Sequence, residues 1–296
     1  MAPEQGGLRL RSVGLTGIRK PLSIQRPDGV HSLAATIHVG VDLPADRKGS
    51  DLSRNAEILA EIVDRTVQEP AGSLEAACSA IARELLARHP SATQATVEAV
   101  AEYFLRRGVT MERQSYEDFL LLAEARAFRE ETGPVRLERS IGAEAVGMTA
   151  CPCAMETARA QLEGEYPLLS DPRLKEVPMI THNQRNRTRL RFTFSGDGEV
   201  EVNAIIDAIE ASQSSPTFAI LKREDEGRVV TDAHRRPKFV EDVLRDLFAS
   251  LPARFPELPD DVLIRASTVS EESIHKYNVE ASHEATMGEI RRSRTA

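Results

Sequence analysis

Apolar and polar residues alternate along two stretches near the start of the chain, at residues 8–23 and 31–44. A period of two places successive side chains on opposite faces, so both stretches are predicted to be β-strands. Two stretches with apolar residues three and four positions apart follow at 54–68 and 73–89, and this spacing predicts helices. The second helix is expected to begin at Ser73, a residue type that favours the N-cap position.

The same order of elements continues through the rest of the chain. Residues 92–105 alternate like a strand, whereas 116–130 fit a strand or a helix equally well. The later segments are strands at 135–150 and 187–197, helices at 201–213 and 237–251, and strands at 261–270 and 275–290. The order strand, strand, helix, helix, strand, strand therefore occurs twice. This repetition predicts an α+β protein of two tandem modules, at residues 1–133 and 134–296.

The longest interruption of these patterns is a predicted loop at roughly residues 151–186. Loops of more than about a dozen residues inside a compact module are usually functional. This loop begins with Cys151-Pro-Cys153, which holds two of the chain's three cysteines, and His182 lies near its end. A disulfide across a single proline is unfavourable. The cysteines therefore suit metal ligation, a reactive thiolate or two buried small side chains, and a thiolate with imidazole suits zinc or ferrous iron.

Composition narrows the class of protein. Hydrophobic residues make up 41% and charged residues 28% of the chain, as in ordinary globular proteins. The net charge of −8 argues against nonspecific binding of nucleic acid but permits a local basic pocket for a phosphorylated small molecule. No apolar run approaches the roughly 20 residues of a membrane span, and the first residues lack the apolar core of a signal peptide. An odd number of cysteines does not form a disulfide framework, so we expect a reducing, cytoplasmic setting.

Four polar segments outside the cysteine loop carry further candidate residues, and each also has a purely structural interpretation. Residues 42–55 form a basic connection that suits either a solvated loop or a phosphate-binding loop. Residues 221–228 form a charge-dense stretch, for which a solvated turn is the simpler interpretation. Residues 239–248 place acids in the first turn of a helix, where they complement the helix dipole. Residues 270–278 combine two glutamates with His275, which suits a metal ligand or a structural histidine.

Taken together, six short motifs resemble the GTP cyclohydrolase I family of type IB, which includes bacterial folate-pathway and archaeal methanopterin-pathway enzymes. The motifs occur in the order LPADRKGSDLSR, GMTACPCA, HNQR, LKREDE, PKFVED and ESIH, between about residues 42 and 275. This resemblance implies the tunnelling fold (T-fold), in which tandem modules assemble into barrels within a homo-oligomer such as a homotetramer. It also implies active sites at subunit interfaces.

The resemblance further implies a reaction. Enzymes of this family open the imidazole ring of GTP, release formate and form a 7,8-dihydroneopterin phosphate. The product is the triphosphate in the folate pathway and the 2′,3′-cyclic phosphate in the methanopterin pathway, and the sequence leaves the choice open. Another T-fold enzyme of purine or pterin chemistry and a noncatalytic metal-binding scaffold are the alternatives.

The motifs also imply roles for individual residues. The expected metal ligands are Cys151, His182, Glu226 and His275, which hold one divalent ion per subunit. Fe²⁺ is the expected ion, with Mn²⁺ and Zn²⁺ as alternatives. Cys151, His182 and Glu272 are expected to be catalytic, and Glu241 is expected to accept hydrogen bonds from guanine. The expected phosphate-binding residues are Lys48, Arg54, Arg185, Lys222 and Arg223.

Overall fold

The computed structural model describes residues 7–26, 29–110, 113–196 and 198–293. Its strands are β1 (Leu10–Arg26), β2 (Gly29–Leu43), β3 (Gln94–Thr110), β4 (Arg113–Phe128), β5 (Arg136–Ala150), β6 (Asn183–Ser195), β7 (Ser215–Pro216), β8 (Leu263–Glu271) and β9 (Val279–Thr286). Its helices are α1 (Leu52–Gln68), α2 (Leu74–Arg88), α3 (Pro152–Glu165), α4 (Val202–Ser212), α5 (Arg223–Arg235), α6 (Val240–Arg254) and α7 (Met287–Ser293). Two short 3-10 turns, η1 (Pro167–Ser170) and η2 (Pro172–Leu174), follow α3.

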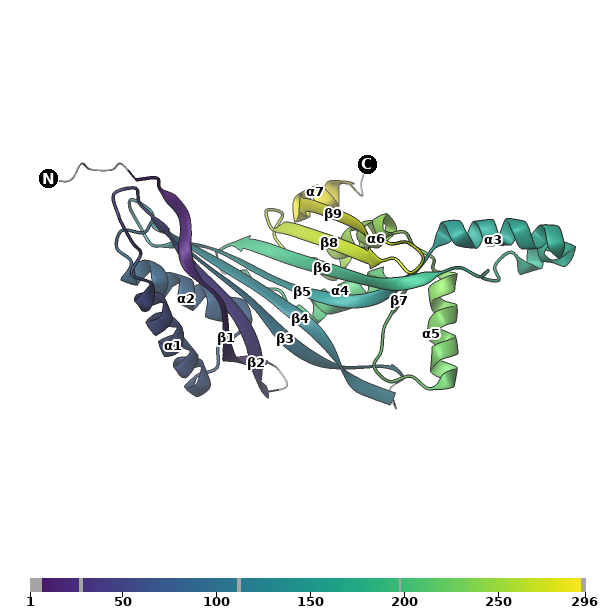
Figure 1. Ribbon diagram of the computed structural model, residues 1–296, viewed down its shortest axis with the longest axis horizontal. Coiled ribbons are helices and arrows are strands. Elements are labelled where there is room, and N and C mark those ends of the chain that lie inside the picture. The colour runs from purple at the N-terminus through teal and green to yellow at the C-terminus, as the bar shows by residue number, and fades with distance from the viewer. Residues whose placement is uncertain (1–6, 27–28, 111–112, 197, 294–296) are drawn as a thin grey trace. The chain divides into compact units, whose positions relative to one another are not determined.

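The strands of the described chain form one sheet in the order β1-β2-β3-β4-β5-β6-β8-β9, with β7 paired to β5 (Figure 1). Neighbouring strands run antiparallel where their registers are defined, as in Ile18 opposite Ile37 and Ala266 opposite His283. Side-chain burial alternates along β6 and β8, as it does in an antiparallel sheet with one covered face. The result is a mixed α/β fold built on an antiparallel sheet.

Contacts divide the chain into two compact units. Unit 1 comprises residues 1–103, 120–142 and 192–200, and unit 2 comprises 104–119, 143–191 and 201–296. The long strands β3 to β6 therefore each contribute residues to both units. The boundary between tandem modules at residues 133 and 134 stays a prediction.

The core of unit 1 lies between α1, α2 and the strands beside them (Figure 1). The apolar stripe of α2, with Leu74, Ile81 and Leu85, is fully or almost fully buried, as its spacing predicts. The predicted N-cap is also confirmed, because Ser73 Oγ accepts a hydrogen bond from the N–H of Ala76 at 3.2 Å.

The core of unit 2 is formed by α4, α6 and β8, and α6 contacts both of the others. Its fully buried side chains include Ile205 and Ile209 on α4, Val243 and Leu247 on α6, and Ile264 on β8. Each helix presents residues three or four positions apart to this core. Apolar packing thus fixes α6, which carries Glu241, against β8, the strand that precedes His275.

The predicted order of elements holds for the first half, where residues 116–130 prove to be strand β4 rather than a helix. The α+β class is likewise confirmed. In the second half, the prediction of an irregular loop at 151–186 is wrong, because Pro152–Glu165 forms helix α3. Cys151 has the extended backbone of an N-cap, proline occupies the first helical position, and good helix formers follow.

Two further segments differ from the sequence-based expectation. The charge-dense stretch expected to be a turn begins helix α5, because Asp225 accepts a hydrogen bond from the N–H of Lys222 at 3.2 Å and caps the first turn. The last predicted strand ends at Thr286, where a capping box starts α7: Glu289 accepts from the N–H of Thr286 at 2.7 Å, and Thr286 Oγ1 accepts from the N–H of Glu289 at 3.3 Å.

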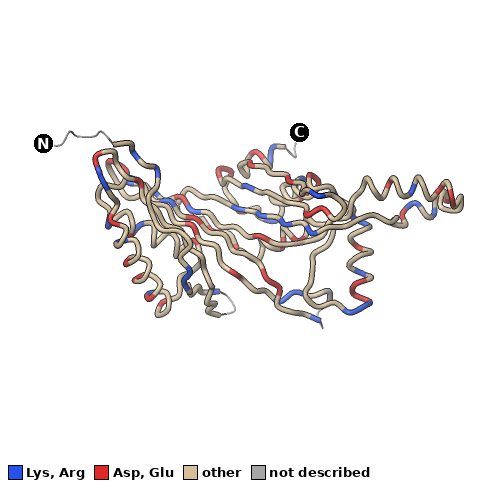
Figure 2. The backbone as a smooth tube through the Cα atoms, viewed as in Figure 1, with Lys and Arg blue, Asp and Glu red and all other residues tan. Residues whose placement is uncertain are grey.

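Charged residues of both signs are interspersed along the described strands and helices (Figure 2). Among the described residues, no helix is both long enough and apolar enough to cross a membrane.

Candidate active site

The ends of β5 and β6 in unit 2 are joined by backbone and side-chain hydrogen bonds around Cys151. The N–H of Cys151 donates to the carbonyl of His182 at 3.1 Å, and Thr181 Oγ1 donates to the carbonyl of Cys151 at 2.7 Å. These bonds close the long excursion between the two strands at its base. They involve only the backbone of Cys151 and His182, so the thiol and the imidazole remain available for chemistry.

The imidazole of His182 faces the segment that follows β8. Its Nδ1 lies 3.2 Å from Ser273 Oγ and 4.0 Å from Glu272 Oε2. The other oxygen of Glu272 accepts a hydrogen bond from Ser270 Oγ at 2.8 Å, which fixes the carboxylate. The ring of His275 stands edge-on to that of His182, with centroids 6.5 Å apart.

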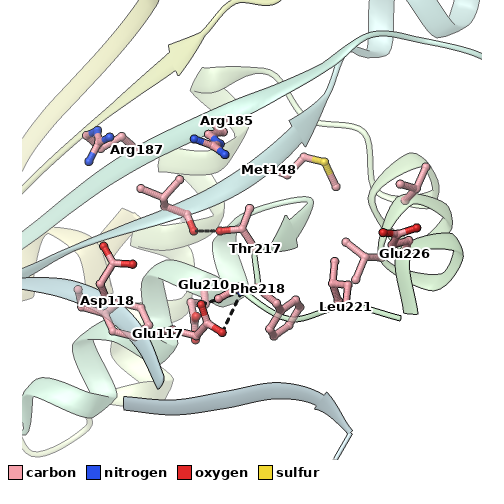
Figure 3. A pocket seen from close by; sticks show the side chains of 15 residues that line it. Glu117, Asp118, Met148, Arg185, Arg187, Glu210, Thr217, Phe218, Leu221 and Glu226 are labelled. Atoms are coloured by element: carbon pink, nitrogen blue, oxygen red, sulfur yellow. Dashed lines mark hydrogen bonds between the residues drawn. The ribbon is translucent and has the colours of Figure 1, made fainter. Parts of the chain in front are cut away.

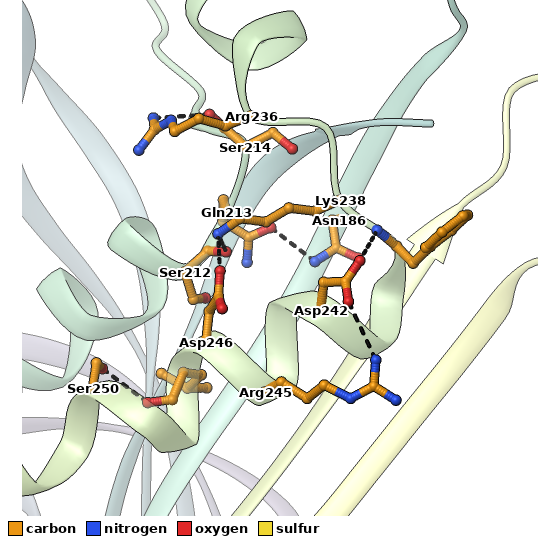
Figure 4. Close-up of polar contacts among 12 residues, drawn as sticks. Asn186, Ser212, Gln213, Ser214, Arg236, Lys238, Asp242, Arg245, Asp246 and Ser250 are labelled. Carbon is orange, nitrogen blue, oxygen red and sulfur yellow. Dashed lines mark hydrogen bonds and ion pairs between the residues drawn. The ribbon is translucent and has the colours of Figure 1, made fainter. Parts of the chain in front are cut away.

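The start of α6 is tied to the same place, and Figure 4 shows the side-chain contacts of Lys238, which precedes that helix. The N–H of Lys238 donates to the carbonyl of Ala150 at 3.0 Å, one residue before Cys151. The ammonium group of Lys238 donates to the carbonyl of Ser212 at 2.6 Å and pairs with Asp246 at 2.6 Å. Glu241, in the first turn of α6, therefore lies three residues after a backbone contact with the strand that leads to Cys151, and its side chain is exposed.

A buried polar network surrounds the first residues of β6, which follow His182 in the chain. Asn186 Nδ2 lies 2.8 Å from Gln213 Oε1 and 2.7 Å from Thr268 Oγ1, and Gln184 Nε2 donates to Thr149 Oγ1 at 3.1 Å. These side chains are at least nine-tenths buried. Because such a network has few alternative arrangements, it fixes the strand that begins directly after His182.

A pocket of about 760 Å³ in unit 2 contains Glu226, one of the expected metal ligands. Figure 3 shows Glu226 on α5, with Met148 of β5 and Arg185 of β6 on neighbouring strands. Met148 precedes Cys151 by three residues and Arg185 follows His182 by three. Three residues of a strand span about 10 Å, so the pocket lies about that far along the chain from both Cys151 and His182.

The two arginines that line this pocket, Arg185 and Arg187, differ in their partners. Arg187 pairs with the buried Glu144 at 2.6 Å, and this hydrogen bond raises the pKa of the guanidinium. Within the described residues, Arg185 has no hydrogen bond or ion pair, and its side chain is exposed. Burial raises the pKa of Glu210 at the pocket's wall, although the nearby Arg107 opposes that shift. Arg185 is thus a cation available to an anionic ligand.

The four expected metal ligands do not meet at one point. Cys151, His182 and His275 lie on segments that contact one another, whereas Glu226 lies in the adjoining pocket. Among the residues that the structure describes, no group of three His, Cys, Asp or Glu side chains is close enough together to hold a metal ion. The donor types nevertheless suit a divalent metal, because they combine a thiol, two imidazoles and a carboxylate.

The expected phosphate-binding residues are distributed over both units. Lys222 and Arg223 are exposed at the start of α5 in unit 2. Lys48 is exposed in unit 1, on the connection between β2 and α1. Arg54 pairs with Asp51 at 3.1 Å, and its Nη1 also donates to the end of α2, so this side chain has a structural partner in its own unit.

Several residues that shape the site were not identified from the sequence. Lys238 links α6 to β5, Ser273 contacts His182, and Glu117 holds the pocket's loop through the N–H of Ala219. Lys238 lies inside the PKFVED motif, which could have drawn attention to it. Glu117 is more than a hundred residues from its partner, and nothing local marks it.

Comparisons with known proteins show the family of this chain. The model of the family described as type I GTP cyclohydrolase folE2 matches residues 2–281. GTP cyclohydrolase MptA 2 of Methanocella arvoryzae is 39% identical over 292 residues, covering 96% of this chain and 94% of that protein. GTP cyclohydrolase MptA of Methanosarcina acetivorans is 40% identical over 294 residues, covering 96% and 92%.

Solved structures with a similar fold are more distant in sequence. The uricase from Arthrobacter globiformis has a TM-score of 0.54 at 10% identity, covering 93% of both chains. The uricase from Bacillus fastidious has a TM-score of 0.53 at 12% identity, covering 96% of both. At this identity the likeness concerns the fold alone. The family match and the relatives extend over nearly the whole sequence, and the chain therefore belongs to the type I GTP cyclohydrolase folE2 family.

Proposed function

We propose that this chain opens the imidazole ring of GTP at the ends of β5 and β6, releasing formate and forming a 7,8-dihydroneopterin phosphate. The observation that carries the proposal is the set of backbone hydrogen bonds joining Cys151, His182 and Lys238. These backbone bonds gather a thiol, an imidazole and the helix of Glu241 at one place without using the thiol or the imidazole itself.

The residues that would hold a divalent metal are Cys151, His182, Glu226 and His275, with Fe²⁺ as the proposed ion. The donor types support this set, and all four residues belong to unit 2. When bound, such an ion lowers the pKa of a water molecule and so supplies hydroxide near neutral pH.

Glu272 is proposed to orient His182 and to act as an acid or base in the reaction. Its carboxylate is fixed by Ser270 and faces His182 Nδ1. A carboxylate placed there stabilises a proton on Nδ1, which leaves Nε2 as the ligating nitrogen. Hydrolysis of the ring requires protonation of the departing nitrogen, and a carboxyl group is suited to that transfer.

Glu241 is proposed to bind the guanine base. A carboxylate accepts two hydrogen bonds from the N1–H and the 2-amino group of guanine, whereas adenine offers no matching pair of donors. A site built in this way rejects ATP strongly. Replacement Glu241→Gln is expected to raise the KM for GTP much more than it changes metal content, and an unchanged KM would assign base binding to another acid.

The triphosphate is proposed to bind Arg185, Lys222 and Arg223 of one subunit together with Lys48 and Arg54 of a neighbour. This arrangement presumes the T-fold barrels and the homo-oligomer that the motifs imply. Mixing inactive Cys151→Ala and Lys48→Ala chains tests it, and Lys48 is preferred because Arg54 also has structural contacts. Shared sites predict partial recovery of activity after subunit exchange, and demonstrated exchange without recovery places each site within one chain.

The direct test is incubation of the purified, Fe²⁺-loaded chain with GTP under anaerobic conditions. Formate and a pterin, which is detected by its fluorescence, should form in equal amounts. Mass spectrometry distinguishes the triphosphate from the 2′,3′-cyclic phosphate. Replacing GTP with ATP is the matched control. Formation of neither product by folded, metal-loaded protein would contradict the proposal.

A further inference from the structure

The start of β4 carries two charged residues that the proposed chemistry does not use. Glu117 is only 9% exposed, and both of its carboxylate oxygens accept from the N–H of Ala219, at 3.0 and 2.9 Å. Ser115 donates a further hydrogen bond to the same carboxylate. Because both oxygens of this buried carboxylate bind one backbone N–H, they fix the position of the loop that contains Ala219.

Arg113, four residues earlier, holds the next part of the same segment. Its Nη1 lies 2.5 Å from Asp225 Oδ2, and the side chain of Asp225 is 7% exposed. The same oxygen of Asp225 accepts from the N–H of Lys222 at 3.2 Å. The residue that caps α5 is therefore also the residue that β4 holds.

These contacts bracket the segment that leads to Glu226. Upstream, Thr217 Oγ1 donates to the carbonyl of Val146 at 2.9 Å, and β7 pairs with β5. Glu226 follows Asp225 directly, and its N–H donates to the carbonyl of Lys222 at 2.9 Å in the first turn of α5. Glu117 and Glu226 line the same pocket (Figure 3).

We propose that Glu117 and Arg113 are positioning residues, which set the place of Glu226 and thereby the affinity of the site for a divalent metal. This inference rests on the proposed role of Glu226 as a ligand. The contacts act on the backbone and the cap of α5 rather than on Glu226 itself. Partners of this kind orient a ligand, and their loss typically weakens metal binding about 10- to 100-fold.

The test measures Co²⁺ affinity of the full chain, by titration of the thiolate-to-cobalt absorption in competition with a chelator. Variants Glu117→Gln and Arg113→Met are expected to bind Co²⁺ about 10- to 100-fold more weakly than the wild type. Arg113→Lys keeps the charge and should recover part of this loss. The signal reports the metal site directly and does not depend on turnover.

The matched control is Asp42→Asn, in unit 1. Asp42 is also a buried strand carboxylate that accepts from backbone N–H groups, those of Thr93 at 2.7 Å and Gln94 at 2.8 Å. This variant should lower stability while leaving Co²⁺ affinity unchanged. Equal weakening by Asp42→Asn would mean that general destabilisation explains the effect, and the inference would fail.

A double-mutant cycle separates positioning from a merely structural role. If Arg113 acts through Glu226, Arg113→Met should have no further effect on Co²⁺ affinity in a Glu226→Ala background. Full additivity of the two effects overturns the inference. Unchanged affinity in Glu226→Ala alone overturns both the inference and the proposed ligand role. Weakened binding in Glu226→Ala with wild-type binding in Glu117→Gln and Arg113→Met overturns the inference only.

Discussion

Replacement of Cys151 by serine should remove a proposed metal ligand without lowering the stability of the fold. Cys151 occupies the N-cap of α3 with φ −74° and ψ 119°, yet its side chain makes no capping hydrogen bond. Serine is among the favoured residues at this position, because its hydroxyl accepts from the N–H groups of the first turn. The same replacement removes the thiolate that the proposed metal site requires.

The two effects have opposite signs and different sizes. A serine N-cap is worth about 0.5–2 kcal/mol relative to alanine, so Cys151→Ser should leave stability unchanged or raise it by up to about 1 kcal/mol. In a chain of this size such a gain shifts the melting temperature by no more than a few degrees. None of the residues of α3 is buried, so the change does not propagate into the core.

The functional effect should be large. A serine hydroxyl is not ionised near neutral pH, whereas a cysteine thiolate is a preferred ligand of zinc and ferrous iron. Loss of a direct ligand should exceed the 10- to 100-fold that is typical of an outer partner. Metal content, formate release and thermal unfolding are measured on the same preparation.

Cys153→Ser is the matched control, because Cys153 is exposed two residues later on the same helix. This variant should keep both metal and turnover. Wild-type metal content and activity in Cys151→Ser would refute the ligand assignment. A loss of stability above about 2 kcal/mol, more than a cap exchange can explain, would show instead that the thiol is structural.

Three further predictions concern unit 1. Burial opposes ionisation of Asp42, but hydrogen bonds from Gln94, Thr93 and an arginine hold its pKa below the usual value. Asp42→Ala leaves two N–H groups unpaired and should therefore lower the free energy of unfolding by about 2–6 kcal/mol at pH 7. In urea unfolding, that difference should shrink as the pH falls below about 4 and through the lower folded pKa. Burial raises the pKa of Glu75 despite hydrogen bonds to the carboxylate. The stability that the protonated carboxyl group contributes is therefore lost as the pH rises through the pKa of the folded state. At pH 8, Glu75→Gln should have a higher melting temperature than the wild type. Burial raises the pKa of the Cys78 thiol, so a thiol reagent at pH 8 should modify it only after unfolding, and rapid labelling of native Cys78 would contradict its burial.

The sequence predicted elements well where periodicity was long and apolar. The stripe of α2 and its cap at Ser73 form as expected, because packing and local capping favour the same structure. It predicted α3 and α5 poorly, because neither helix buries an apolar stripe: α3 has no buried residue, and α5 buries only Asp225 and Ala233. The decisive signals there were a proline after Cys151 and the capping carboxylate of Asp225, which are short and local.

Sequence patterns likewise identified some residues of the candidate site and missed others. Cys151, His182 and His275 belong to compact motifs, and the fold places their segments next to one another. Arg113 and Glu117 escaped notice because their function depends on contacts with residues more than a hundred positions away. A single sequence does not display such pairings, since strand register and loop path decide them.

The architecture of the site also indicates which substitutions should affect stability. Cys151, His182 and Lys238 are brought together by backbone groups, so the thiol and the imidazole are not required to close the structure. Glu117 and Arg113, in contrast, stabilise a backbone segment with charged side chains that are at least partly buried. Replacing a side chain of the first kind removes chemistry and little stability, whereas replacing one of the second kind displaces backbone and leaves donors unpaired. The enzyme thus separates the groups that react from the groups that position them, and paired measurements of metal affinity and unfolding distinguish the two classes.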